Sequence, residues 1–166
     1  KMGVACTIFM PEEATLAKVR ATKAYGADVH LVGQDYQETY EKAVQRTQDK
    51  GAVYIHAFDD YTVMAGAGTL GLEIREDLPK VDTVLVPIGG GGLICGVATA
   101  LKGLDPKIKV IGVQAERAPS VAISWREGRM MSTGSADTWA EGLATRVPAE
   151  MTMDILRHYL SDVVLV

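Results

Sequence analysis

Short apolar runs alternate with longer segments of mixed apolar and polar residues along almost the whole chain. The runs are rich in β-branched residues and are bounded by Gly, Pro or Asp, a pattern typical of buried strands. The mixed segments carry helix signals: Pro11 stands ahead of two acidic residues, and Gly26 ends the first such segment. The pattern predicts strands over residues 4–10, 28–32, 52–56, 81–86, 108–113 and 163–166.

The same pattern predicts helices between these strands. Their ranges are residues 11–25, 36–50, 61–77, 119–127 and 148–160, with one more helix that follows a glycine run and ends at residue 101. Strands and helices that alternate at such short spacing favour parallel β-α-β units. We therefore expect an α/β fold with parallel sheets and helices on both faces. The least clear boundary lies near Ala57, where short βα units give way to a long helix.

Composition narrows the class of protein. The chain has 166 residues, 48% apolar and 23% charged, with a net charge of −4, as ordinary globular proteins do. Its Lys and Arg residues are spread out, so we expect no nucleic-acid partner. No apolar run approaches the roughly 20 residues that cross a bilayer, so we expect no membrane partner. Cys6 and Cys95 stand alone in apolar surroundings, which favours two buried thiols in a reducing, cytoplasmic compartment.

Both ends of the chain are apolar. The run over residues 4–10 follows the first residues at once, and the chain stops within the run over 163–166. Unpaired apolar strand edges are an aggregation hazard, so we expect this chain to be a piece of a longer protein. For the same reason we expect a homo-oligomer or an accompanying chain.

Four consecutive glycines, Gly89–Gly92, lie between the most strand-like run and a helix of small residues. Glycine reaches φ > 0 at little steric cost, so successive N–H groups can turn toward one point. The helix behind them adds unpaired N–H groups and the positive end of its dipole. No Gly-Lys-Ser/Thr follows the loop, and the loop has no positive side chain. We therefore expect its backbone to bind the phosphate of a larger cofactor rather than a phosphoryl group in transfer.

Other interpretations of this loop stay open on these residues alone. The spacing of Gly90, Gly92 and Gly96, with Glu116 after the next strand, loosely fits a dinucleotide site. The chain would then be part of an NAD- or FAD-dependent oxidoreductase. A glycine run can also simply let a strand and a helix pack closely. A further alternative is a non-catalytic interaction module.

Three further groups of residues have structural interpretations. Asp59 and Asp60 precede the helix predicted from residue 61 and are expected to cap it. The small residues between Ala65 and Gly71 are expected to pack that helix tightly on a sheet. The histidines lie on different predicted elements, which does not favour a zinc site: His30, His56 and His158.

Seven stretches of the chain carry a family resemblance. In order they are Phe9–Lys18, Gly26–Gly33, His56–Asp60, Ala65–Ile74, Val86–Leu93, Ile111–Glu116 and Trp139–Ala144. Together they resemble the threonine/serine dehydratase group of fold-type II enzymes that use pyridoxal 5′-phosphate (PLP), a group that includes serine racemase. The resemblance covers essentially all of the chain but only the central part of a family member.

The resemblance implies a partial two-domain fold similar to tryptophan synthase β, with a cofactor cleft. Residues 1–57 would be part of the smaller domain, and residues 58–166 part of the larger, cofactor-binding domain. Phe58 matches a position that lines the pocket near the cofactor ring, and Glu141 with Gly142 matches a segment that runs past the cofactor. The residues that match the loop whose backbone amides hold the phosphate are Gly89, Gly90, Gly91, Gly92 and Leu93.

Three positions depart from the family pattern. Glu116 matches an acidic ligand of a divalent or monovalent cation, but Ser120 and Ala122 stand where the assisting ligands would be. Ala67 stands where glutamine is usual in the Gly-x-Gly-Thr segment.

The resemblance further implies a PLP-dependent lyase. The parent enzyme would remove the hydroxyl of threonine or serine by β-elimination and release a 2-oxo acid and ammonia, so a small amino acid is the expected substrate. Family members bind PLP through a Schiff base to a lysine in a Ser-x-Lys segment, and no lysine of this chain has that context. We therefore expect this chain to be catalytically silent when it is alone.

Overall fold

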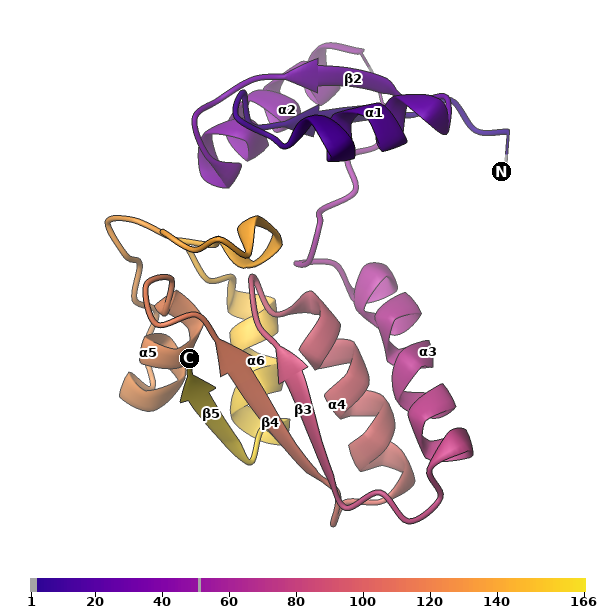
Figure 1. Ribbon diagram of the computed structural model, residues 1–166, viewed down its shortest axis with the longest axis vertical. Helices are drawn as coiled ribbons and strands as arrows, with labels where there is room; N and C mark the ends of the chain where they lie inside the picture. The colour runs from indigo at the N-terminus through magenta and orange to yellow at the C-terminus, as the bar shows by residue number, and fades with distance from the viewer. Residues whose placement is uncertain (1–2, 51) are drawn as a thin grey trace. The chain divides into compact units, whose positions relative to one another are not determined.

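The protein is described by a computed structural model that covers residues 3–50 and 52–166 (Figure 1). The chain forms two compact units, Lys1–Tyr54 and Ile55–Val166. Each unit contains a parallel sheet whose strands are connected through helices. The predicted α/β class is therefore confirmed.

The first unit is a β-α-β-α segment. Its elements are β1 (Thr7–Met10), α1 (Leu16–Ala24), β2 (Asp28–Leu31) and α2 (Tyr36–Lys50). β1 and β2 pair in parallel over the full length of both strands. The chain turns into α2 at Gly33, where φ is +86° and a Cβ would lie 2.8 Å from the backbone nitrogen of Thr39. Among the residues of this unit whose side chains the structure describes, the buried apolar ones are Met10, Val19 and Ala43.

Three predictions about this part of the chain are wrong. The helix predicted over residues 11–25 begins only at Leu16, and its first turn has no acidic residue. Residues 52–56 form no strand, and Val53 and Ile55 are 88% and 69% exposed. A β-branched run becomes a strand only where a neighbouring strand supplies hydrogen-bond partners, and no described strand pairs with this run. Cys6, predicted to be buried, is exposed, because it lies ahead of β1 in a stretch that is exposed from residue 3 to residue 7.

The second unit contains a three-stranded parallel sheet in the order β3-β4-β5. No helix in the described part of either unit is long and apolar enough to cross a membrane. Seven elements of this unit match the predicted ones to within a few residues at their ends: α3 (Tyr61–Asp77), β3 (Thr83–Pro87), α4 (Gly92–Leu104), β4 (Lys109–Gln114), α5 (Ser120–Glu127), α6 (Glu150–Tyr159) and β5 (Asp162–Leu165). The short 3-10 helix η1 (Glu141–Leu143) was not predicted.

The core of the second unit lies against one face of this sheet. The fully buried side chains of α4 pack there with those of α6, Met153 and Leu156. The opposite face carries Leu85, which is 62% exposed. α4 follows β3 directly after the glycine loop, so the amino end of α4 lies at the carboxyl edge of the sheet (Figure 1). The α4 residues in this core are Ile94, Cys95, Val97, Ala98 and Leu101.

α3 packs on α4, not on the sheet (Figure 1). A Cβ on Gly68 would lie 3.1 Å from the carbonyl oxygen of Gly96, and a Cβ on Gly71 would lie 3.0 Å from that of Val97. A Cβ on Gly96 would overlap the carbonyl oxygen of Met64. The small residues of α3 do allow a close approach to another backbone, as predicted. The expected partner, a sheet, was wrong: the partner is α4, which itself covers the sheet.

Candidate anion-binding site

The glycine loop ends in a helix start that no side chain caps. Gly91 has φ +100° and ψ −8° and is the N-cap of α4, which has no side-chain cap hydrogen bond and no acidic residue in its first turn. The N–H of Cys95 donates to the carbonyl of Gly91 at 2.9 Å. The N–H groups of Gly92, Leu93 and Ile94 therefore lie ahead of the intrahelical hydrogen bonds, where helix geometry leaves donors for an external acceptor.

Phe58 lies directly against this loop. A Cβ on Gly90 would overlap the Phe58 ring, and a Cβ on Gly92 would lie 2.8 Å from both Cα and Cβ of Phe58. Only glycine allows this approach at both positions. The structure thus brings Phe58, predicted to line the pocket, to the loop predicted to bind phosphate.

The turn that holds Phe58 leads into a capped helix. The Asp60 carboxylate accepts hydrogen bonds from the N–H groups of Thr62 at 2.7 Å and Val63 at 3.1 Å, which confirms it as the cap of α3. These backbone hydrogen bonds lower the pKa of Asp60. Asp59 has a different role, because its N–H donates to Nδ1 of His56 at 2.8 Å.

Two other segments of the second unit close around the loop. A Cβ on Gly89 would lie 3.1 Å from Cα of Leu143 and 3.2 Å from the carbonyl oxygen of Gly142, both in η1. A Cβ on Gly91 would lie 3.2 Å from Cβ of Thr152 in α6. The segment of Gly142, predicted to pass the cofactor, therefore touches the first glycine of the loop.

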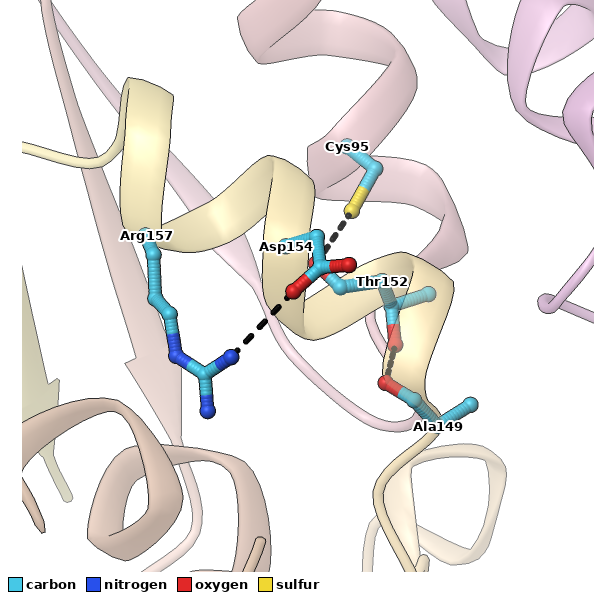
Figure 2. Close-up of polar contacts among 5 residues, drawn as sticks. All are labelled: Cys95, Ala149, Thr152, Asp154 and Arg157. Carbon is cyan, nitrogen blue, oxygen red and sulfur yellow. Dashed lines mark hydrogen bonds and ion pairs between the residues drawn. The ribbon is translucent and has the colours of Figure 1, made fainter. Parts of the chain in front are cut away.

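Thr152 and Cys95 tie α6 to α4 (Figure 2). The hydroxyl of Thr152 donates to the carbonyl of Ala149 at 2.9 Å, and the Cys95 thiol donates to the carbonyl of Thr152 at 3.4 Å. Burial, with a smaller contribution from the Asp59 charge, raises the pKa of Cys95 to about 12. The thiol stays neutral and serves as a structural donor.

The loop fits a phosphate group through its main chain. The Cβ side of each glycine from Gly89 to Gly92 faces protein atoms, so close packing explains why no larger residue stands there. The start of α4 has no anion of its own, so its N–H groups and the positive end of its dipole are available to one from outside. The two interpretations of the glycine run are compatible.

The glycine loop fits a phosphate, but the surroundings of Glu116 do not fit a cation. Glu116 follows β4 and is exposed. The hydroxyl of Ser120 donates to the carbonyl of Thr145 at 2.8 Å, and Ala122 offers no side-chain oxygen. Over the described residues, no three His, Cys, Asp or Glu side chains are grouped as metal ligands would be.

Some of the predicted site residues meet at the glycine loop, and others do not. Phe58 and Gly142 meet the glycine loop, whereas the side chains of Glu141 and Leu93 are exposed. Glu116 shares the carboxyl edge of the sheet with the loop, since β3 and β4 are parallel neighbours. Sequence reasoning missed three residues that shape the site, which are His56, Leu143 and Thr152. The position of His56, two residues before Phe58 and just ahead of a helix cap, was the one available signal.

An α/β protein with an uncapped glycine-rich helix start at the carboxyl edge of a parallel sheet belongs to the class that binds phosphorylated cofactors. The particular family follows from comparison with known proteins. The family model described as "Pyridoxal-phosphate dependent enzyme" matches residues 1–166, and the chain belongs to this family. Gly96, the third glycine of the alternative dinucleotide pattern, is accounted for by its contact with α3.

Curated relatives agree with this family. The chain is 46% identical over 165 residues to the L-threonine ammonia-lyase of Geobacter sulfurreducens. The aligned region covers 99% of this chain and 41% of that protein. It is 44% identical over 165 residues to the L-threonine dehydratase catabolic TdcB of Staphylococcus aureus, covering 99% of this chain and 48% of that protein. The chain thus spans less than half the length of these relatives.

Solved structures agree as well. The structure of maize serine racemase matches with a TM-score of 0.92 at 32% identity, covering 99% of this chain and 50% of that one. The processed form of threonine deaminase isoform 2 from Solanum lycopersicum matches with a TM-score of 0.89 at 37% identity, covering 98% and 47%. The predicted resemblance to fold-type II PLP enzymes is confirmed.

Proposed function

We propose that this chain is part of a PLP-dependent ammonia-lyase that removes the hydroxyl of threonine or serine, and that its own part is to hold the cofactor phosphate. The observation that carries the proposal is the uncapped, glycine-built start of α4. Its support comes from curated relatives, among them the threonine ammonia-lyases and dehydratases that are 43% to 46% identical to this chain.

In this proposal the residues of the chain bind and orient. The N–H groups from Gly89 to Leu93 donate to the phosphate, and the dipole of α4 favours its negative charge. Phe58 lines the pocket beside the loop, while Glu141 and Gly142 form a wall on the side of Gly89. Bound PLP supplies the electron sink for the electrons left on the substrate α-carbon. The lysine that family members use is not in this chain, so we expect the chain alone to release no 2-oxo acid.

Other parts of the proposal come from the resemblance alone. Glu116 is proposed only as a single cation ligand. Residues 1–57 and 58–166 are proposed as parts of a smaller and a larger domain of the parent enzyme. A homo-oligomer or accompanying chain and a cytoplasmic location also stay predictions.

The experiment is a binding comparison that excludes lysine adducts. Pyridoxine 5′-phosphate and pyridoxine lack the aldehyde of PLP, so neither forms a covalent bond with a surface lysine, and they differ only by the phosphate. We expect the phosphate ester to bind about tenfold or more tightly, since charge-assisted hydrogen bonds are among the stronger ones. Backbone amide shifts in ¹H–¹⁵N NMR spectra of the whole chain should move most from Gly89 to Leu93.

Inorganic phosphate serves as the matched competitor: it should shift the same amide signals from Gly89 to Leu93 and weaken the apparent affinity for pyridoxine 5′-phosphate. Equal affinities for the two vitamers, or shifts centred away from Gly89–Leu93, would contradict the proposed phosphate cradle. Release of 2-oxobutyrate from L-threonine by the chain with added PLP, above the rate of PLP alone, would contradict its expected silence.

A further inference from the structure

The turn over residues 56–59, just ahead of α3, is held in shape by one nitrogen of the His56 imidazole. Nδ1 of His56 accepts hydrogen bonds from the N–H of Phe58 at 3.2 Å and from the N–H of Asp59 at 2.8 Å. The rings of His56 and Phe58 meet edge to face, with centroids 4.6 Å apart and planes at 90°. One side chain therefore fixes both the backbone of the turn and the orientation of the Phe58 ring.

This turn is coupled to the glycine loop through Phe58. The Phe58 ring occupies the space that a Cβ on Gly90 would need, and its Cα and Cβ approach Gly92 in the same way. Because Phe58 packs directly on the main chain there, with no intervening side chain from the loop, a shift of the turn is transmitted to the start of α4.

We infer that His56 is a positioning residue of the phosphate site: its unprotonated Nδ1 holds the turn that seats Phe58 against Gly90 and Gly92, and so keeps the start of α4 in the shape that binds the anion. This inference rests on the function proposed above and adds a residue to it. His56 acts through Phe58 and is not placed in contact with the cofactor.

The electrostatic surroundings of His56 agree with a neutral ring. Burial lowers the pKa of His56, and the nearby Asp59 and Asp60 carboxylates oppose this to a lesser degree. From α4, Cys95 adds no charge, because its thiol pKa is raised to about 12. A ring that accepts two hydrogen bonds at Nδ1 carries its proton on Nε2. Protonation of Nδ1 would turn the acceptor into a donor and break both bonds.

The first test needs no ligand. Long-range ¹H–¹⁵N spectra of the whole chain, with ¹⁵N-labelled histidine, report which ring nitrogen carries the proton. We expect an unprotonated Nδ1 in His56 at pH 7.5, and we expect the amide signals of Gly90 and Gly92 to titrate together with this ring as the pH falls. A proton on Nδ1 at pH 7.5, or glycine signals that ignore the titration of His56, would overturn the inference even if the phosphate site is real.

The second test uses a matched pair of amides. In His56→Asn the carboxamide oxygen is as many bonds from Cβ as Nδ1 is, whereas His56→Gln moves it one carbon further. We expect the Asn variant to keep the affinity for pyridoxine 5′-phosphate within about twofold, and the Gln variant to lose about five- to tenfold, as expected when hydrogen bonds to the turn are lost. Equal losses in both variants would overturn the inference.

A pH profile separates positioning from general stability. Between pH 7.5 and 5.5 the affinity of the unaltered chain should fall more steeply than that of His56→Asn, which has no titrating ring. Ionisation of the ligand phosphate is common to both proteins and cancels in the ratio. Identical slopes would contradict the inference. If neither protein binds the ligand, the proposed phosphate site fails, and the ligand-free NMR titration still decides the role of His56.

Discussion

In the second unit, α3 and α4 pack against each other and begin in opposite ways. The start of α3 carries its own anion, because the Asp60 carboxylate accepts from the N–H groups of Thr62 and Val63. The start of α4 has a glycine N-cap in the left-handed region and no side-chain cap. Every helix start presents the same unpaired donors. At α3 the chain satisfies two of them with its own carboxylate, whereas no side chain of the chain does so at α4.

An uncapped start alone does not define such a site. α5 and α6 also lack side-chain cap hydrogen bonds. What separates α4 from them is the run of four glycines against which Phe58, Leu143 and Thr152 pack. These contacts hold the uncapped N–H groups in a fixed arrangement, which costs less on binding than ordering a mobile loop would.

The largest effect that tests this comparison concerns Cys95, in the first turns of α4. A cysteine near a helix N-terminus usually has a lowered pKa, because the dipole stabilises its thiolate. Burial instead raises the pKa of Cys95 to about 12. The start of α4 is therefore not neutralised by a thiolate of its own chain. We expect Cys95 in the native protein to react with a disulfide reagent at pH 8 about a thousandfold more slowly than an ordinary thiol.

The exposed Cys6 provides the internal reference. The whole chain should show one fast thiol, Cys6→Ser should show none, and both thiols should react once the protein is unfolded in urea. A fast phase that survives in Cys6→Ser would mean that Cys95 is accessible and ionised, and that the start of α4 stabilises an internal anion after all.

A smaller but still large effect is expected where the two helices touch. A Cβ on Gly96 would overlap the carbonyl oxygen of Met64 and lie 2.6 Å from the backbone nitrogen of Gly68. Both neighbours are backbone atoms, so Gly96→Ala must push the helices apart, at a cost of about 3 kcal/mol. Gly103→Ala, on the same helix with open space around it, should be neutral or stabilise by about 0.5–1 kcal/mol. Urea unfolding midpoints measure both, and equal midpoints would contradict the close α3–α4 packing.

Local signals made most of the second unit predictable. The β-branched run ahead of Gly89 and the small residues after Gly92 predicted a strand, a loop and a helix, and the structure has them there. Asp60 was predicted as a cap because aspartate ahead of a helix bonds only to its own neighbours in sequence. Such features depend on residues a few positions apart, so a single sequence contains them.

Features that depend on distant partners were not predictable in this way. The run over residues 52–56 has strand-like residues, but it forms no strand where no described strand lies beside it. The small residues predicted that α3 approaches another backbone. They did not show that this backbone is that of Gly96 and Val97 in α4. Thr152 follows Gly91 by 61 positions, and no spacing rule links a loop to a residue so far along the chain.

The smallest expected effect removes the cap that α3 has and α4 lacks. Asp60→Ala takes away the acceptor of two N–H groups and should lower the melting temperature by about 4 °C. Asp60→Asn keeps an acceptor oxygen and should lose less. The hydrogen bonds from Val63 and Thr62 lower the pKa of Asp60. The stability that its carboxylate adds is therefore complete above the ordinary pKa near 3.8 and is lost as the pH falls through the lower native value. Melting curves between pH 7 and 3 should show this loss in the unaltered chain and not in Asp60→Asn.

Affinity for pyridoxine 5′-phosphate at pH 7.5 should change less than twofold in either variant, since the start of α4 keeps its own donors. A larger change would show that the two helix starts act as one site.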